Sequence, residues 1–450
     1  MSILSINALA LDLVAGDFSY GHAPTNGGPT KTSRALAIIH LAAHDAYAQA
    51  SGVLTPKLTG GLPPLPGSIP VSQNSGETAL IGAGLRACLA LYPDEALFIE
   101  HASEALRFGR DLATLTYGET VADAWVNARM FDGSDMPLEN RKYDQAAGKH
   151  RPDPLDPGQA QHGPNWGKVK PFILTNVASD AFLKAPPGLA DPAYFSSWLD
   201  VKKNGKADLP FRSAKYREHA EIGIFWGYDG SNRLGTPPRM YLQVVRSIVG
   251  FKNATSYDQQ VRILAACSAA MADAGIAAWH WKYTYNLWRP VLGIREADAG
   301  WGPLGLGDAN PARAAAKEPG DPFWLPLGAP RSNPHPGPVT GAAGANVTPN
   351  FPAYPSGHST FGSACFGTAA KLLGKTPGLI DVEFTSDEFN GSTRDNTGAA
   401  RPRWTQKTTL QECIKQNAES RIYLGVHWDF DASGGADVGD AIAAIAGAKF

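Results

Sequence analysis

Apolar residues recur at intervals of three and four along several stretches of the chain, which is the spacing of one face of an α-helix. Alternation of apolar and polar residues, which marks a half-buried strand, is sparse. The pattern predicts a mainly α protein of two packed helical bundles of the four-helix-bundle type, with long structured loops. The clearest helical stretches are residues 31–52, 76–92, 257–288, 359–374 and 409–426.

The chain of 450 residues is long enough to bury a large core. We expect one unit over residues 1–450, with an N-terminal helical half of about 1–215 and a C-terminal half of about 216–450. Between the helical stretches, 35 prolines and 48 glycines indicate long loops. The longest, residues 295–350, has almost no periodicity and leads directly into the sequence FPAYPSGHST, so we expect it to have a functional role.

Composition and charge exclude several classes of partner. The chain has 43% hydrophobic and 18% charged residues and a net charge of -2, so no basic surface for nucleic acid is indicated. No stretch of eighteen uncharged apolar residues predicts a membrane span. The first residues lack a basic region and Asp12 interrupts them, so we expect a soluble protein, cytoplasmic or exported without a recognisable signal peptide. Four scattered cysteines favour buried thiols over a zinc site.

The sequence PSGH at residues 355–358 places a histidine at the start of a predicted helix. Pro355 fixes its own φ, and Gly357 lets a ligand approach the backbone. Free N–H groups at a helix start favour an anion. Ser356 and Gly357 are therefore candidates for anion binding, and His358 for proton transfer. The alternative is a capped helix start with an incidental histidine.

A second candidate segment is KYTYNLWRP, in which Lys282 and Arg289 are seven residues apart. In a continuous helix this spacing puts both cations on one face. Because the segment is rich in tryptophan and tyrosine, we expect these cations to be buried around a shared anion or carboxylate. The alternative is a solvated basic face.

The third candidate segment, SRIYLGVHWDFD, contains Arg421, His427 and Asp431. Asp431 lies four residues after His427, so its carboxylate can orient the imidazole and leave Nε2 free. In an unbroken helix Arg421 and His427 point about 120° apart. We therefore expect the backbone to deviate near Gly425 if both serve one site.

These three segments, in this order, resemble the three-part signature of the superfamily of vanadium haloperoxidases and type 2 phosphatidic acid phosphatases. The sequences FWGYDGSNRLGTPPR, FPAYPSGHSTFG, SRIYLGVHWDFDA and LAIIHLAAHDAY resemble stretches of the vanadium-dependent chloroperoxidases within it. The likeness extends from about residue 30 to about residue 440.

The resemblance implies one vanadate cofactor (V5+) per subunit. His427 would bond the metal axially, and His358 would contact the apical oxygen as acid and base. Asp229 would pair with an arginine and support the acid–base histidine, and Asp431 would lie behind His427. The residues implied to hold the equatorial oxygens are Lys282, Arg289, Ser356, Gly357 and Arg421.

The resemblance also implies a halide pocket beside the oxyanion. Trp279 and Phe351 correspond to aromatic residues that flank the halide, and phenylalanine at this place is typical of chloride-oxidising enzymes. We also assign Ser359 to this pocket; it follows His358 where the fungal enzymes carry alanine. We expect its hydroxyl to tune the pKa of His358 or to bond the peroxide, which Lys282 would polarise.

The implied function is oxidation of chloride, bromide or both by hydrogen peroxide to hypohalous acid, which halogenates a small organic substrate. A homo-oligomer is compatible with the sequence. One alternative is a soluble acid phosphatase, in which His427 would be the nucleophile and His358 would protonate the leaving group. Another is an oxyanion-binding protein without catalysis, which would need the cations but not the two histidines.

Overall fold

The computed structural model describes residues 2–19, 23–136, 142–209, 212–230, 232–252, 255–328, 348–394 and 399–450. Its longer helices are α1 (Ser2–Asp17), α2 (Gly28–Ser51), α3 (Gln73–Leu91), α4 (Ala96–Arg107), α5 (Leu112–Ala128), α7 (Pro192–Asn204), α8 (Ala214–Phe225), α9 (Pro237–Ser247), α10 (Tyr257–Tyr285), α14 (Gly357–Leu373), α15 (Leu410–Tyr423) and α16 (Asp429–Lys449). The short helices and turns are α6 (Val177–Asp180), α11 (Pro290–Arg295), α12 (Pro311–Ala316), η1 (Pro93–Glu95), η2 (Trp166–Lys168), η4 (Ile248–Lys252), η5 (Pro377–Leu379) and η6 (Asp387–Phe389).

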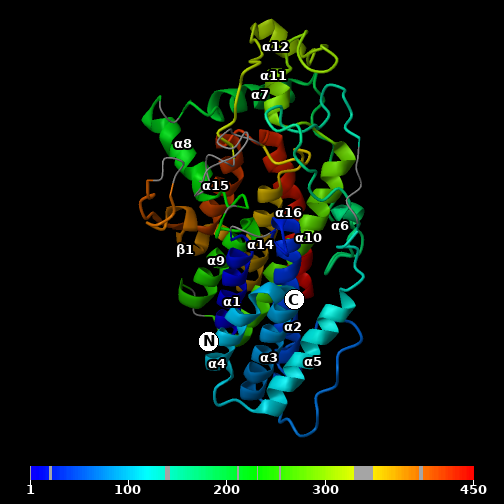
Figure 1. The fold of residues 1–450 in the computed structure, drawn as a ribbon, viewed down its shortest axis with the longest axis vertical. Helices are drawn as coiled ribbons and strands as arrows, with labels where there is room; N and C mark the ends of the chain where they lie inside the picture. The colour runs from blue at the N-terminus through cyan, green and yellow to red at the C-terminus, as the bar shows by residue number, and fades with distance from the viewer. Residues whose placement is uncertain are drawn as a thin grey trace.

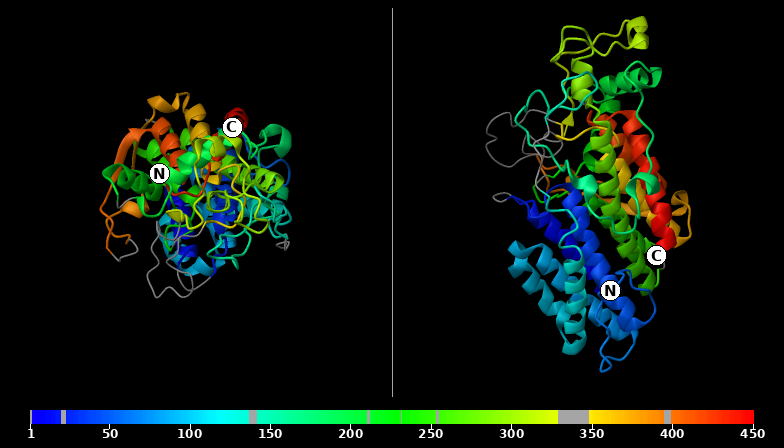
Figure 2. Two further views of the ribbon diagram at one scale, coloured as in Figure 1. Left: turned by 90° about the horizontal axis from the view of Figure 1, so that it is seen from above. Right: turned by 90° about the vertical axis from the view of Figure 1, so that its right-hand side faces the viewer.

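The helices pack into two groups that share α10. In the first group α2, α3 and α5 pack on one another, and in the second α14 packs on α16 and α15. Helix α10 contacts α2 on one side and α14 and α16 on the other. Figures 1 and 2 show the first group in blue and cyan in the lower part of the molecule and the second above it. The predicted mainly α fold is confirmed; the boundary near residue 215 stays a prediction.

The described residues contain one small sheet, in which β1 (Asp381–Thr385) pairs antiparallel with β2 (Thr405–Thr409). Asp381 lies opposite Thr409 and Thr385 opposite Thr405. The sheet precedes α15 and packs beside α9. It is an addition to the helical groups and contributes no side chain to the site described below.

Helix α10 is the central element of the fold. It starts with a capping box formed by Ser256 and Gln259 and ends at Asn286, whose φ of 54° is left-handed. Among the described residues it is the one helix long and apolar enough to cross a membrane, but 94% of its most apolar window is buried inside the protein. Its hydrophobicity therefore serves packing on α2 and α14.

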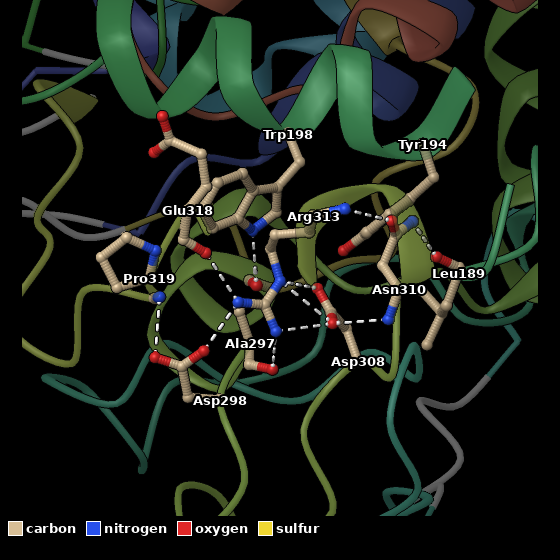
Figure 3. Close-up of polar contacts among 12 residues, drawn as sticks. Leu189, Tyr194, Trp198, Ala297, Asp298, Asp308, Asn310, Arg313, Glu318 and Pro319 are labelled. Carbon is tan, nitrogen blue, oxygen red and sulfur yellow. Dashed lines mark hydrogen bonds and ion pairs between the residues drawn. The ribbon is translucent and has the colours of Figure 1, made fainter. Parts of the chain in front are cut away.

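The described first part of the long loop, up to residue 328, is organised around Arg313 (Figure 3). The guanidinium donates to the carboxylate of Asp308 at 2.8 Å and to Asp298 at 2.6 Å. It also donates to the main-chain carbonyls of Ala297 and Glu318. Because all its N–H groups point to partners within the loop, this part has a structural role; residues 329–347 lie outside the described residues.

Helix α1 is attached to α2 by a buried histidine. The Nδ1–H of His40 donates to the carbonyl of Leu36 at 2.7 Å, and Nδ2 of Asn7 lies 3.0 Å from Nε2. Burial lowers the pKa of His40 to about 4. The unfolded chain, in which this pKa is near 6.5, therefore binds a proton at a higher pH than the folded chain does.

We predict that His40→Gln makes the protein less sensitive to acid. Because the folded pKa of His40 is lowered, its contribution to stability is present above about pH 6.5 and is lost as the pH falls toward 4. In urea unfolding experiments over that pH interval, the free energy of unfolding of the wild type should fall by up to about 3 kcal/mol more than that of H40Q. The exposed His101 provides the control, since H101Q should track the wild type. Parallel pH profiles of H40Q and wild type would contradict the prediction.

Candidate active site

An inner cavity of about 190 Å³ lies where α10, α14 and the α15–α16 connection meet. The wall of the cavity contains glycines, aromatic rings, guanidinium groups and imidazoles. The carboxylate in this wall is that of Asp229. The predicted site residues that line this cavity are Asp229, Trp279, Arg289, Phe351, Gly357, His358, Arg421 and His427.

The start of α14 forms one wall of the cavity. Ser356 is the N-cap residue, and its N–H donates to the carbonyl of Asp431 at 2.8 Å, which ties α14 to α16. Its Oγ faces the N–H of Ser359, so it caps the helix. A Cβ on Gly357 would meet nothing closer than the ring of Trp279 at 3.5 Å. Packing within the protein therefore leaves room for a side chain at Gly357.

Lys282 and Arg289 approach the site in a way that differs from the prediction. Helix α10 ends at Tyr285 and Asn286 turns the chain, so Arg289 is the residue before α11 and not on the same helix face as Lys282. The periodic pattern missed this break because apolar residues continue at Leu287 and Trp288, although asparagine is a residue type that often ends a helix. The turn nevertheless directs the Arg289 guanidinium into the inner cavity.

Each of the two cations is held by main-chain carbonyls. Arg289 donates from Nε to Phe351 at 2.9 Å and from Nη1 to Val426 at 2.8 Å. Lys282 donates from Nζ to the carbonyls of Pro352 and Ala353, both at 2.9 Å, and of Pro355 at 2.5 Å. Lys282 is fully buried beneath the segment that leads into α14 and does not itself line the cavity.

The predicted deviation near Gly425 is confirmed. Helix α15 ends at Tyr423, Gly425 has a φ of 71°, and α16 starts at Asp429. A Cβ on Gly425 would fall 2.3 Å from the carbonyl oxygen of Gly205, so the position needs glycine for space as well as for its conformation. This reversal brings Arg421 and His427 to the same cavity.

Asp431 fixes the orientation of His427. Nδ1 of His427 lies 2.8 Å from Oδ2 of Asp431, which also accepts from the N–H of Trp428. Because a carboxylate accepts hydrogen bonds, Nδ1 of His427 carries the hydrogen and Nε2 carries the lone pair. The prediction of a free Nε2 is wrong in one respect, because Nη1 of Arg289 lies 3.0 Å from it. Burial raises the pKa of Asp431 to about 7.

The other side of the cavity holds Arg421, Asp229 and His358. Asp229 makes a two-point ion pair with Arg421, at 2.8 Å from Nη2 and 3.2 Å from Nη1, so that predicted pairing is confirmed. The His358 ring contacts the carbonyl of Gly227, which lies 2.8 Å from Nε2. Because a carbonyl accepts, Nε2 carries the hydrogen and Nδ1 is the basic atom of His358.

Burial and positive charge keep both histidines neutral. Burial, followed by the charge of Arg421, lowers the pKa of His358 well below its ordinary value. Burial, followed by the charge of Arg289, does the same for His427. Burial lowers the pKa of Arg289 to about 9, with Arg421 adding to the shift. The site therefore combines concentrated positive charge with two basic imidazole nitrogens.

Two guanidinium N–H groups at the cavity have no acceptor among the described residues. They are Nη2 of Arg289 and Nε of Arg421, and both are buried. An unsatisfied buried donor costs about 1–3 kcal/mol, more when it is charged. A ligand with several acceptor oxygens and negative charge would satisfy both, which makes the inner cavity a candidate oxyanion site.

The aromatic wall includes one residue that sequence reasoning missed. The rings of Trp279 and Phe351 lie 4.9 Å apart, and His162 lies against both, at 5.7 Å and 5.9 Å. His162 comes from a loop without periodicity, so no helical pattern pointed to it. The only signal in the sequence was the glycine that follows it; in the structure Gly163 has a φ of 65° and its Cβ position falls 2.6 Å from the indole of Trp279.

Ser359 is placed elsewhere than predicted. Its Oγ donates to the carbonyl of Ala432 at 2.6 Å, and its Cβ lies against Gly435. It is therefore a contact between α14 and α16 and does not line the inner cavity. The helical turn that directs His358 toward the cavity necessarily directs the next side chain about 100° away.

Similarity to known proteins identifies the family of this chain. The chain is 30% identical over 496 aligned residues to the vanadium chloroperoxidase of Curvularia inaequalis, covering 91% of this chain and 76% of the relative. The chain belongs to the vanadium haloperoxidase family. Residues 262–450 match the family model of the VCPO second helical-bundle domain.

Solved structures support the fold of this haloperoxidase. It resembles a bacterial vanadium-dependent iodoperoxidase with a TM-score of 0.66 and 19% identity, covering 100% of this chain and 96% of that one. It also resembles the holo form of a bacterial vanadium-dependent chloroperoxidase, with a TM-score of 0.64 and 17% identity over 95% of this chain and 94% of that one.

The cofactor of the family is vanadate, and the residues present here fit it. Two unpartnered guanidinium donors, the open space at Gly357 and the lone pair of His427 Nε2 face one small cavity. Oxygen acceptors would satisfy the donors, and an imidazole nitrogen is a suitable ligand for a transition metal. Lys282 adds positive charge from behind the wall.

We predict that Gly357→Ala reduces the affinity for orthovanadate at least 10-fold without destabilising the protein. The new Cβ has no contact under 3.5 Å with protein, and alanine favours a helix, but the methyl group enters the space at the cavity wall. Calorimetric titration and thermal unfolding would measure the two effects. Gly378→Ala, with open space around it, is the matched control. Vanadate affinity within twofold of wild type would rule out this use of Gly357.

Proposed function

We propose that this haloperoxidase oxidises chloride, bromide or both with hydrogen peroxide, and that the resulting hypohalous acid halogenates a small organic substrate. The observation that carries the proposal is the pair of unpartnered guanidinium donors, Arg289 Nη2 and Arg421 Nε, in a cavity that also holds two neutral imidazoles. A phosphate ester would use the same donors, but the small inner cavity leaves little space for a leaving group.

The halide range rests on the aromatic wall and on one relative. Phe351 is the residue type expected beside chloride, and it lies in contact distance of Trp279. The relative from Curvularia inaequalis is a chloroperoxidase, and this likeness supports the choice of chloride and bromide as the halides of this protein. Because a bacterial structural neighbour is an iodoperoxidase, iodide belongs in any test of the range.

We assign direct contact with the oxyanion to Arg289, Arg421 and Gly357, and the role of metal ligand to His427 Nε2. Nη1 of Arg289 lies 3.0 Å from this Nε2, so it must move away before the nitrogen can bond a metal. Lys282 and Ser356 support the site from behind, since the first is held by three carbonyls and the second caps α14.

Proton transfer is assigned to Nδ1 of His358. Forming hypohalous acid and water from peroxide and halide consumes one proton, so a base that can hold and return a proton is required. Bound vanadate supplies Lewis acidity toward peroxide without redox change of the protein. Donation from Nε2 to Gly227 fixes the ring, and the ion pair with Asp229 positions Arg421 at the same cavity.

We predict that purified protein stripped of oxyanion halogenates a diketone only when orthovanadate is restored. Separate assays with chloride, bromide and iodide define the halide range, and added phosphate should compete with vanadate. His358→Ala should lower the rate about 10²–10⁴-fold while vanadate still binds, because only the acid–base group is lost. H101A, at the exposed His101, is the control.

The same preparation should be tested with p-nitrophenyl phosphate. Hydrolysis that vanadate inhibits, together with no halogenation of the diketone, would make the protein an acid phosphatase and overturn the proposal. Oxyanion binding with neither activity would identify a binding protein instead.

A further inference from the structure

The chain between α8 and α9 touches the machinery of the inner cavity on both sides of Tyr228. The residue before it, Gly227, accepts a hydrogen bond from Nε2 of His358 at 2.8 Å. The residue after it, Asp229, forms the two-point ion pair with Arg421. Tyr228 itself lines the inner cavity and is fully buried. One residue therefore lies between the two contacts that orient the acid–base histidine and one of the cations.

Tyr228 adopts a backbone conformation that its residue type disfavours. Its φ is 43°, in the left-handed region, where a bulky side chain is an outlier. A residue in this region persists only where the surrounding contacts fix it, and such residues are frequent at active sites. The contacts of the Tyr228 side chain therefore decide whether the turn keeps its shape.

The hydroxyl of Tyr228 belongs to a closed cycle of three hydrogen bonds. It donates to Oε1 of Gln243 at 3.0 Å, and Nε2 of Gln243 donates to Oδ2 of Asp387 at 3.0 Å. The main-chain N–H of Asp387 completes the cycle by donating to the Tyr228 oxygen at 2.7 Å. Burial, followed by the charge of Asp387, raises the pKa of Tyr228, so the hydroxyl keeps the proton that it donates.

Asp387 connects the small sheet to this cycle. It is the first residue of η6, which follows β1, and its carboxylate also accepts from Nη1 of Arg239 at 2.5 Å. The preceding residue, Ser386, donates from Oγ to the carbonyl of Phe225, the last residue of α8, at 2.7 Å. The turn is thus tied to one segment both at its start and at Tyr228. The sheet contributes no side chain to the inner cavity, but the segment after β1 holds the turn that does.

We propose that Tyr228 is a positioning residue, whose hydroxyl holds the left-handed turn and thereby sets His358 and Arg421 in the inner cavity. Without the hydroxyl the cycle opens, and the backbone at residue 228 can change to the negative φ that tyrosine favours. That change would move the Gly227 carbonyl and the Asp229 carboxylate away from their partners. The effect on oxyanion binding stands apart from the proposed function, whereas the effect on rate rests on it.

The first test is the affinity for orthovanadate, measured by calorimetric titration. Tyr228→Phe keeps the ring and removes the hydroxyl, and we expect the affinity to fall about 3- to 10-fold as Arg421 loses its fixed position. Tyr117→Phe is the matched control, because Tyr117 is also buried and donates to Oε1 of Gln49 at 2.7 Å, between α5 and α2. Y117F should bind vanadate within twofold of the wild type.

Gln243→Leu opens the same cycle from its other side. It should lower the vanadate affinity by a similar factor, and it decides the question alone if Y228F does not fold. Because both substitutions break one cycle, the double variant should bind about as well as Y228F and not show the product of the two losses. Vanadate affinity within twofold of the wild type in Y228F and Q243L, or an equal loss in Y117F, would overturn the proposal.

The second test observes His358 directly, by nitrogen-15 NMR of histidine-labelled protein. Its signals are identified by their loss in His358→Ala. The wild type and Y117F should carry the hydrogen on Nε2 alone, whereas Y228F should exchange between both tautomers, because the acceptor at Gly227 has moved. A single Nε2–H tautomer in Y228F would also overturn the proposal.

The third test separates kcat from KM in bromide oxidation by the vanadate-loaded enzyme. We expect Y228F to lower kcat about 10-fold through the misplaced acid–base group and to leave the KM for bromide within twofold. A kcat within twofold of the wild type would contradict the role of Tyr228. If the wild type shows no vanadate-dependent oxidation, the proposed function fails, while the vanadate affinities and the His358 tautomer still decide the role of Tyr228.

Discussion

The site depends on an excess of buried positive charge that the protein itself does not neutralise. Lys282, Arg289 and Arg421 are all at most 2% exposed. The carboxylates nearby are Asp229, which is paired with Arg421, and Asp431, which is occupied with His427. Removing charges from water is expensive unless they are compensated. The arrangement is therefore incomplete without an anion. The other residues of the site hold the cations in positions where an anion can bind.

Three changes of chain direction hold these cations together. Asn286 ends α10 in a left-handed conformation, Gly425 reverses the chain between α15 and α16, and Ser356 starts α14 with its N–H on Asp431. Each lies at the end of a helix that contributes residues to the hydrophobic core. The helices thus provide rigidity, while the short connections direct the functional groups, which is the usual division between scaffold and site.

Apolar periodicity is a local signal, and it predicted α2, α3, α10, α14 and α15. The mainly α fold, the pairing of Asp229 with an arginine that the family resemblance implied, the break near Gly425 and the contact of Asp431 with His427 are confirmed. The last of these needed only an i, i+4 spacing beside a histidine.

Predictions failed where the answer depended on tertiary contacts. Lys282 and Arg289 were assigned to one helix because the apolar pattern continues through Leu287 and Trp288, although an asparagine followed by a proline is typical of a helix end. Ser359 was assigned to the halide pocket from its place beside His358, but helix geometry turns it to α16. His162 was missed because a loop carries no periodic signal, and its contact with Trp279 joins residues 117 positions apart.

The most direct test of the oxyanion site is a crystal structure of the protein grown with orthovanadate, with anomalous scattering used to locate vanadium. We expect one vanadium in the inner cavity, bonded to Nε2 of His427, with Nη1 of Arg289 displaced from that nitrogen. Nη2 of Arg289 and Nε of Arg421 should each donate to an oxygen of the ion. A cavity without vanadium at saturating vanadate, with Arg289 still on His427, would contradict the assignment.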